Sequence, residues 1–148
     1  MNENQPTVRT FHYDQITEGQ KETFDYSITP AIYERFLEAF QDYSPIHVDE
    51  AYAKARGFEG RVMHGSLLNG FISHFVGTWF PGRLSLLLAV DLRFSQPSYL
   101  GDRIRLEIVV SQKMVAKNII VMNATLFNLT RQHLAARGRI QVMVKEDS

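Results

Sequence analysis

Polar and apolar residues alternate early in the chain and then recur with the period of a helix. Residues 24–28 alternate between the two kinds of side chain, which predicts a first β-strand. Thr29-Pro30 has the chemistry of a helix start, because a hydroxyl can cap a helix and proline suits its first position. Apolar residues then recur with a spacing of four: Ile32, Phe36 and Phe40. This apolar face predicts a helix that ends near Gln41, since Pro45 disfavours helical backbone just before it.

Two further helices are predicted downstream. Asp49 can cap a short helix over residues 50–56, and Gly57 can close it in a left-handed conformation. The segment from Gly65 to Trp79 is apolar around most of a helical circumference. The rest of that circumference is a narrow stripe of small residues: Ser66, Gly70, Ser73 and Gly77. We expect such a helix to be largely buried, with a stripe that lets another backbone or a ligand approach closely.

The period changes to two in the second half of the chain. Four runs of alternating polarity follow one another: residues 86–94, 104–110, 118–129 and 134–144. The connections between them are short, as antiparallel neighbours require. One strand, then helices, then four strands in a row predicts the α+β class, with about five antiparallel strands and the helices on one face. A single buried helix wrapped by such a sheet is the hot dog arrangement.

Composition narrows the classes of function. The 148 residues suit one domain over 1–148, and no repeat or linker divides them. Lys and Arg equal Asp and Glu at 16 each, which argues against binding to nucleic acid or to an anionic membrane. The chain has no cysteine, so disulfides and a thiol nucleophile are excluded. No signal peptide or membrane-spanning run is evident, which favours a cytoplasmic protein. Without cysteine or a second histidine at ligand spacing, no metal site is expected.

Candidate chemistry gathers in the segment that follows the first helix. Asp42 and His47 stand at two ends of a short loop stiffened by Pro45, so a carboxylate and an imidazole can reach one water molecule. Gly65 offers a backbone N–H at a helix start, without a side chain to block approach. Such a donor can stabilise negative charge on a carbonyl oxygen. Together these groups suit the addition of water to a 2-enoyl thioester, because the thioester carbonyl oxygen gains negative charge as an enolate forms.

The segment Asp42-Tyr43-Ser44-Pro45-Ile46-His47 resembles the Asp-x-Asn-Pro-x-His motif of MaoC-like (R)-specific enoyl-CoA hydratases, the hydratase 2 family. Residues 57–68 are similar to the family segment that enters the central helix, and residues 94–102 to a family turn between strands. The resemblance implies the hot dog fold and a thioester substrate carried by CoA or acyl carrier protein, with no other cofactor. It also implies a homodimer or higher homo-oligomer, because family members pair their sheets edge to edge.

The resemblance assigns roles to individual residues. Asp42 and His47 activate the water and return its proton, and the product is an (R)-3-hydroxyacyl thioester. Gly65 donates its N–H to the thioester oxygen, and Ser73 supports the substrate or Asp42. His64 is expected to orient the loop. Ser44 stands where the family usually has asparagine, and its hydroxyl offers one donor where the amide offers two.

Two other functions remain open on the sequence. A hot dog acyl-CoA thioesterase would use a similar pocket and a carboxylate, although the spacing of Asp42 and His47 is not its usual arrangement. A non-catalytic protein that binds acyl thioesters would keep the fold without turnover, and Ser44 is compatible with it. Taken singly, Asp42 could be a solvated carboxylate and His47 a turn histidine that caps a carbonyl.

Overall fold

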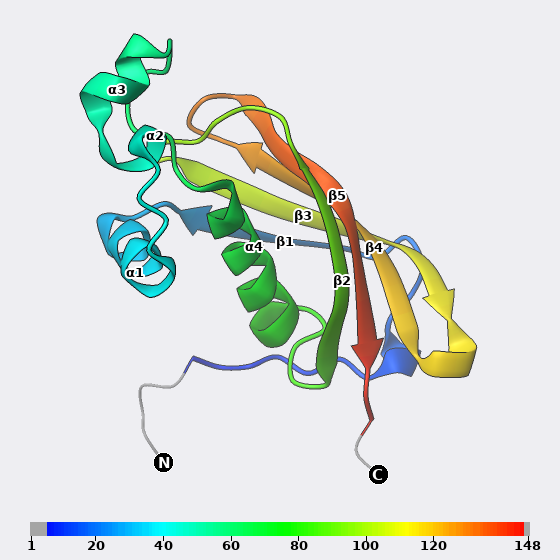
Figure 1. Cartoon of the computed structure of the whole chain (residues 1–148). Coiled ribbons are helices and arrows are strands. Elements are labelled where there is room, and N and C mark those ends of the chain that lie inside the picture. Colours follow the sequence, from blue (N-terminus) through cyan, green and yellow to red (C-terminus); the bar gives the residue numbers. More distant parts are fainter. Residues whose placement is uncertain (1–5, 147–148) are drawn as a thin grey trace.

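The computed structural model describes residues 6–146, which form a five-stranded antiparallel sheet curved around one central helix (Figure 1). The strands are β1 (Lys21–Ser27), β2 (Ser85–Phe94), β3 (Arg103–Met114), β4 (Ile119–Asn128) and β5 (His133–Val144). Their order in the sheet is β1-β3-β4-β5-β2. This architecture confirms the predicted α+β hot dog fold. Residues 1–5 and 147–148 of the single domain expected over the chain lie outside the described residues.

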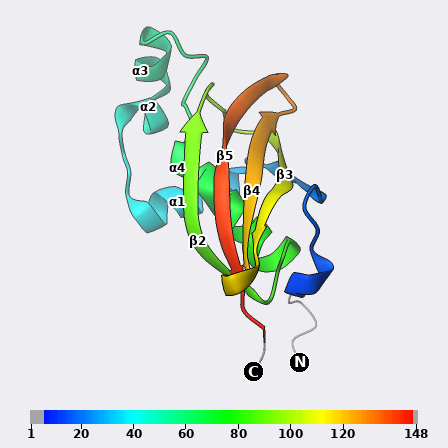
Figure 2. The same cartoon turned by 90° about the vertical axis from the view of Figure 1, so that its right-hand side faces the viewer.

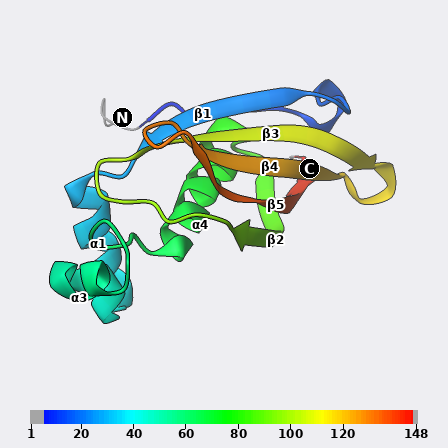
Figure 3. The ribbon, with the colours of Figure 1, turned by 90° about the horizontal axis from the view of Figure 1, so that it is seen from above.

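The central helix has two parts that run on without a break. It starts as α4 (Gly65–His74) and continues through a π-helical turn (Phe75–Trp79), so it occupies the predicted segment. Its large apolar side chains pack against the sheet and are buried: Leu67, Leu68, Phe71, Ile72, Phe75 and Val76. The sheet lies along one side of the helix, as the view from above makes clear (Figure 3).

The small stripe on this helix is not buried. Its four residues, Ser66, Gly70, Ser73 and Gly77, are all exposed, whereas the large apolar residues of α4 are buried. The physical reason is that the sheet covers only one side of the helix. The stripe therefore borders open space instead of packing against another backbone.

Three short helices lie at the N-terminal end of α4 (Figure 1). In α1 (Pro30–Phe40) the Thr29 hydroxyl accepts a hydrogen bond from the Ile32 N–H at 3.2 Å, and Gln41 ends the helix in a left-handed conformation. In α3 (Glu50–Ala55) Asp49 caps the helix start. Both starts and ends were predicted. No helix of the described residues is long and apolar enough to cross a membrane.

A third short helix was not predicted. The segment expected to be a loop between Asp42 and His47 contains α2 (Pro45–Val48), one helical turn. Proline at its first position is favourable, because its φ angle suits a helix and its missing N–H would have had no partner there. The segment that contains Asp42 and His47 is therefore held by a turn of helix and not by an irregular loop.

The order of the strands corrects one expectation. The short connection between residues 94 and 103 suggested that β2 and β3 are neighbours, whereas β2 pairs with β5 at the far edge of the sheet (Figure 2). The link 95–102 can cross the two intervening strands, because each extended residue spans about 3.3 Å and three strand spacings amount to about 14 Å. A short link therefore did not require adjacent strands.

The connection expected at residues 111–117 is also shorter than predicted. Strand β3 continues to Met114 and pairs with the start of β4, after an irregularity between Val110 and Gln112. The irregularity interrupts the alternation of polarity that marked the end of the strand in the sequence.

Strand β2 is an edge strand with an exposed apolar run. Leu86, Leu87 and Leu88 are exposed, while Val90 and Leu92 are partly buried against the core. Because β2 pairs on one side only, its other side leaves backbone donors and acceptors free for a further strand.

Candidate active site

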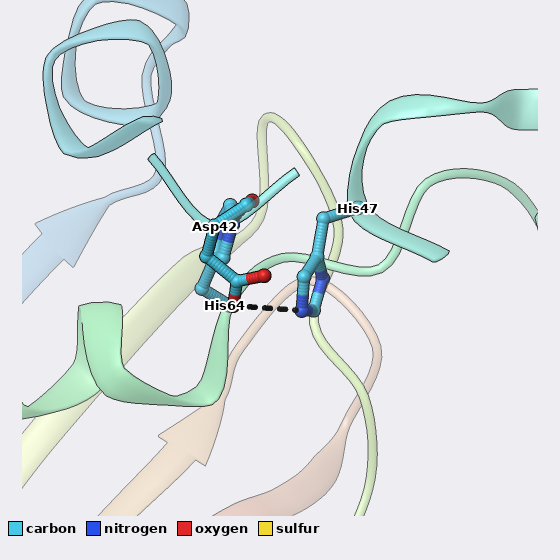
Figure 4. A group of neighbouring side chains, drawn as sticks. All are labelled: Asp42, His47 and His64. Atoms are coloured by element: carbon cyan, nitrogen blue, oxygen red, sulfur yellow. Dashed lines mark hydrogen bonds and ion pairs between the residues drawn. The ribbon is translucent and has the colours of Figure 1, made fainter. Parts of the chain in front are cut away.

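Asp42 and His47 face each other across the turn between α1 and α2 (Figure 4). Their nearest side-chain atoms, Asp42 Oδ2 and His47 Nε2, are 3.7 Å apart. The left-handed Gln41 ends α1 and redirects the chain at Asp42, and α2 carries His47 in its last turn. The His47 side chain is 16% exposed and that of Asp42 is 52% exposed, so the pair stands at the mouth of the site.

The backbone fixes which nitrogen of His47 can act as a base. Nδ1 lies 2.7 Å from the carbonyl oxygen of Val62. A carbonyl can only accept, so Nδ1 must carry the proton and donate it there. Nε2 of neutral His47 is then left with a free lone pair, directed toward Asp42. This arrangement leaves Nε2 able to take a proton from a bound water.

One oxygen of the Asp42 carboxylate accepts a hydrogen bond from the backbone, and the other is left available toward His47. The Ser44 backbone N–H donates to Asp42 Oδ1 at 3.1 Å, which leaves Oδ2 toward His47. The side chain of Ser44 is exposed and makes no capping hydrogen bond at the start of α2. Position 44 therefore contributes to Asp42 through its main chain, which asparagine and serine share.

His64 lies beneath the pair and is almost completely buried, with 3% of its surface exposed. Its Nε2 lies 2.9 Å from the main-chain carbonyl oxygen of Asp42, and must donate to it for the reason given for His47. The rings of His64 and His47 are in contact at a tilt of 32°, with centroids 4.0 Å apart, and the centroid of the Phe36 ring is 4.8 Å from that of His64. His64 therefore contacts both members of the pair, through the backbone of one and the ring of the other.

Two contacts that sequence reasoning missed hold α2 in place. The Tyr33 hydroxyl donates to the carbonyl oxygen of His47 at 2.7 Å, and the Val62 N–H donates to that of Ile46 at 2.9 Å. The contacts made by Val62 use main-chain atoms, so its side chain gave no signal for them. The sequence did carry a signal for Tyr33, because the hydroxyl of a buried tyrosine usually has a hydrogen-bond partner.

Gly65 is the first residue of α4, and none of the hydrogen bonds found among residues 6–146 uses its N–H. A donor at this position has no intrahelical partner and lies at the positive end of the helix dipole. The ring of Phe94, at the end of β2, faces Gly65 on the side where a side chain would project. A Cβ atom at position 65 would be 3.3 Å from that ring.

Two hollows meet at these residues and share His47, His64 and Gly65. The smaller, of about 290 Å³, extends between the start of α4 and the link after β2, with Phe94 in its wall. The larger, of about 610 Å³, extends along α4 and also contains Asp42 and Ser73. The predicted residues Asp42, His47, His64, Gly65 and Ser73 thus line one continuous site.

Ser73 stands apart from the pair within that site. It lies two turns of α4 beyond Gly65 and its surface is exposed. No hydrogen bond within the described part of the chain joins it to Asp42, whose Oδ1 and main-chain oxygen accept from Ser44 and His64 instead. The geometry therefore favours contact with substrate over support of Asp42.

Asp42, His47 and His64 each offer an atom with metal-binding chemistry, and these atoms lie within 4.8 Å of one another. The spacing of the histidines in the sequence did not suggest this group, because α2 and the start of α4 meet only in the folded chain. Hydrogen bonds to Val62 and Asp42 carbonyls leave each imidazole a single free nitrogen. A cation on His47 Nε2 would occupy the lone pair that proton transfer needs, so we interpret the group as an acid–base site.

Residues 13–131 match the family model of the MaoC like domain, which covers most of the chain. The protein belongs to the MaoC-like domain family. This result confirms the resemblance inferred from the motif at Asp42 and His47.

Several characterised relatives are similar to this MaoC-like chain. An (R)-specific enoyl-CoA hydratase of Rhodospirillum rubrum is 30% identical over 114 residues, which cover 77% of this chain and 79% of the relative. An enzyme of the same description from Aeromonas caviae is 30% identical over 109 residues, covering 74% and 81%. The unliganded structure of R-hydratase PhaJ1 from Pseudomonas aeruginosa superposes with a TM-score of 0.86 at 31% identity, covering 95% of this chain and 89% of that one.

Proposed function

We propose that this protein catalyses the reversible syn hydration of trans-2-enoyl thioesters to (R)-3-hydroxyacyl thioesters. Its relatives are hydratases and dehydratases of acyl thioesters, which places the chain among the hydro-lyases. The observation that carries the finer proposal is the pairing of two free acid–base atoms, Asp42 Oδ2 and His47 Nε2, at 3.7 Å. The unused N–H of Gly65 lines the same hollow.

The pair can hold and activate one water molecule. A water oxygen can sit about 2.8 Å from both Asp42 Oδ2 and His47 Nε2, because these atoms are only 3.7 Å apart. As the oxygen forms a bond to Cβ of the substrate, a proton of the water passes to the pair. His47 is suited to accept it, since Val62 keeps the proton of the neutral ring on Nδ1.

Charge moves away from the pair during this step. The π electrons of the Cα–Cβ bond shift toward the thioester, and its oxygen becomes an enolate oxygen. The Gly65 N–H stabilises that oxygen better than the neutral carbonyl, because hydrogen bonds to charged acceptors are stronger. The pair then returns a proton to Cα, and the enolate reverts to the thioester. Water has been added across the double bond from one side, which makes the addition syn.

Two further expectations concern the position of the thioester carrier and the oligomeric state of the protein. The pair stands at the mouth of the hollow, so the thioester would enter there with CoA or acyl carrier protein remaining outside. We expect a homodimer or higher homo-oligomer formed through β2, whose exposed leucines and unpaired edge suit a second copy of the strand.

The non-catalytic alternative rested on Ser44. The contact that position 44 makes with Asp42 uses the main-chain N–H, so replacement of asparagine by serine leaves that contact intact. This observation favours the enzyme over a protein that only binds acyl thioesters.

The test is a hydration assay with trans-2-enoyl-CoA substrates, which follows the loss of ultraviolet absorbance of the conjugated thioester. The product is then analysed on a chiral column, and free thiol is measured in parallel. We expect loss of absorbance, an (R)-3-hydroxyacyl product and no free CoA. Release of thiol without hydration would identify a thioesterase, and tight binding without either reaction would identify the non-catalytic alternative.

A further inference from the structure

We propose that the acyl chain of the substrate lies in an apolar groove between α1 and α4, and that Gly70 is the residue that admits it. The inference rests on the proposed function and adds to it the class of substrate, thioesters with acyl chains well beyond four carbons. The groove has a volume of about 560 Å³ and lies over β1. Phe24, Ile32, Phe36, Phe40, Leu67 and Phe71 form most of its walls.

The groove is continuous with the larger of the two hollows described above, which contains Asp42 and is called the catalytic hollow below. Both spaces are lined by Phe36, Phe40 and Gly70. The catalytic hollow is also lined by Asp42, His47 and Gly65, which do not border the groove. Phe36 and Phe40 come from α1 and Gly70 from α4, so the passage between the two spaces runs between these helices. An acyl group whose carbonyl is bound at Gly65 can therefore extend over Gly70 into the groove.

Gly70 is the position where a side chain would close this passage. Gly70 lies between two sets of residues on the surface of α4. Ser66 and Ser73 on one side of it line the catalytic hollow, and Leu67 and His74 on the other side line the groove. A Cβ atom at position 70 would have no atom within 4 Å apart from the backbone of its own helix, so the space above it is open. A large residue here would fill the passage without displacing the core.

The chemistry of the groove suits a saturated chain. Its walls are mainly aromatic and aliphatic, with Arg35 as the charged residue among them. At its far end the Tyr26 hydroxyl and His74 Nδ1 form a hydrogen bond of 2.9 Å. From Gly65 to His74 the helix rises about 13.5 Å, because each residue of an α-helix adds about 1.5 Å. A four-carbon acyl group ends short of the groove, whereas a ten-carbon chain reaches into it.

Burial in the groove gives a measurable preference for chain length. Full burial of one methylene group improves binding by about fourfold. The groove is open along one side, with Phe40 70% exposed, so we expect a smaller gain for each methylene. Across six added carbons even a twofold gain per carbon amounts to roughly 60-fold.

The experiment compares Gly70→Leu with Gly77→Leu, a matched control further along the same small stripe. A Cβ atom at position 77 also has no atom within 4 Å apart from the backbone of its own helix, and Gly77 borders neither the hollow nor the groove. Leucine is favoured over glycine in helices, so neither change should weaken the central helix. The kcat/KM of each protein is measured with four-carbon and ten-carbon trans-2-enoyl-CoA, and the binding of butyryl-CoA and decanoyl-CoA by calorimetry.

We expect Gly70→Leu to lower the ratio of kcat/KM for the ten-carbon substrate to that for the four-carbon substrate by roughly 30-fold or more. Gly77→Leu should leave this ratio unchanged. If Gly70→Leu lowers kcat/KM equally for both substrates, or leaves the preference for the ten-carbon substrate unchanged, the assignment of the groove is overturned. If the wild-type protein hydrates neither substrate, the proposed function fails. The groove is then judged by calorimetry alone, where decanoyl-CoA must bind the wild-type protein more tightly than butyryl-CoA and lose that advantage in Gly70→Leu.

Discussion

The buried imidazole of His64 holds the backbone of Asp42, since its Nε2 donates to the Asp42 carbonyl oxygen at 2.9 Å. The same ring packs against that of His47 with a centroid distance of 4.0 Å. One side chain at the start of the central helix therefore positions both members of the acid–base pair.

Loss of this contact should slow the reaction without removing its acid or base. We expect His64→Ala to lower kcat by roughly 10-fold or more, because a displacement of about 1 Å can cost about 100-fold. His64→Gln should recover part of the loss, since its amide can donate to the same carbonyl. The measurement is kcat across pH for both variants. A pH profile of changed shape would contradict a purely positioning role and would indicate that His64 itself exchanges a proton.

Removal of either acid–base group should be more severe. We expect Asp42→Asn and His47→Gln each to lower kcat by about 100-fold or more, the lower end of the effect of a general acid–base group. Both changes keep the size of the side chain, and the main-chain contacts of α2 remain, so the melting temperature should stay close to that of the wild type. Near wild-type turnover in either folded variant would remove that residue from the mechanism.

The unusual residue in the motif should tolerate reversion. We expect Ser44→Asn to raise kcat or leave it unchanged, because the side chain is exposed and the Ser44 N–H that binds Asp42 is kept. The check is a comparison of kcat and of thermal stability with the wild type. A large loss of activity in a folded Ser44→Asn protein would mean that the turn depends on the hydroxyl itself.

A side chain at position 65 should interfere with the thioester oxygen. We expect Gly65→Val to lower kcat/KM by about 100-fold or more, by analogy with the loss of an oxyanion donor. Because a Cβ atom here would approach the Phe94 ring at 3.3 Å, part of the loss could come from displacement of Phe94.

The double variant Gly65→Val, Phe94→Ala separates the two causes. If crowding of the oxyanion site dominates, removal of the Phe94 ring restores little activity. Recovery of most of the activity would show instead that the wall of the smaller hollow had been disturbed. Normal turnover of Gly65→Val itself, with Asp42 and His47 in place, would mean that the carbonyl binds elsewhere.

Local chemistry made much of this site readable from the sequence. The cap at Thr29, the end of α1 at Gln41 and the cap at Asp49 each depend on side chains within a few residues, so their positions were predicted correctly. The segment Gly65 to Trp79 showed a helical pattern long enough to mark the central helix. The pair Asp42 and His47 also belongs to one short segment, and a turn of helix brings its ends together.

Contacts between distant segments were decided only by tertiary structure. The pairing of β2 with β5 instead of β3 depends on how the whole sheet closes around α4, since a short link allows either order. The small stripe is exposed because the sheet covers only one side of the helix, a fact that helical periodicity does not contain. The Val62 carbonyl that orients His47 is a main-chain atom, which every residue carries, so no residue type could have indicated it. The sequence thus determined the elements and the reactive groups, whereas packing decided their partners, because partners depend on distances that only the folded chain defines.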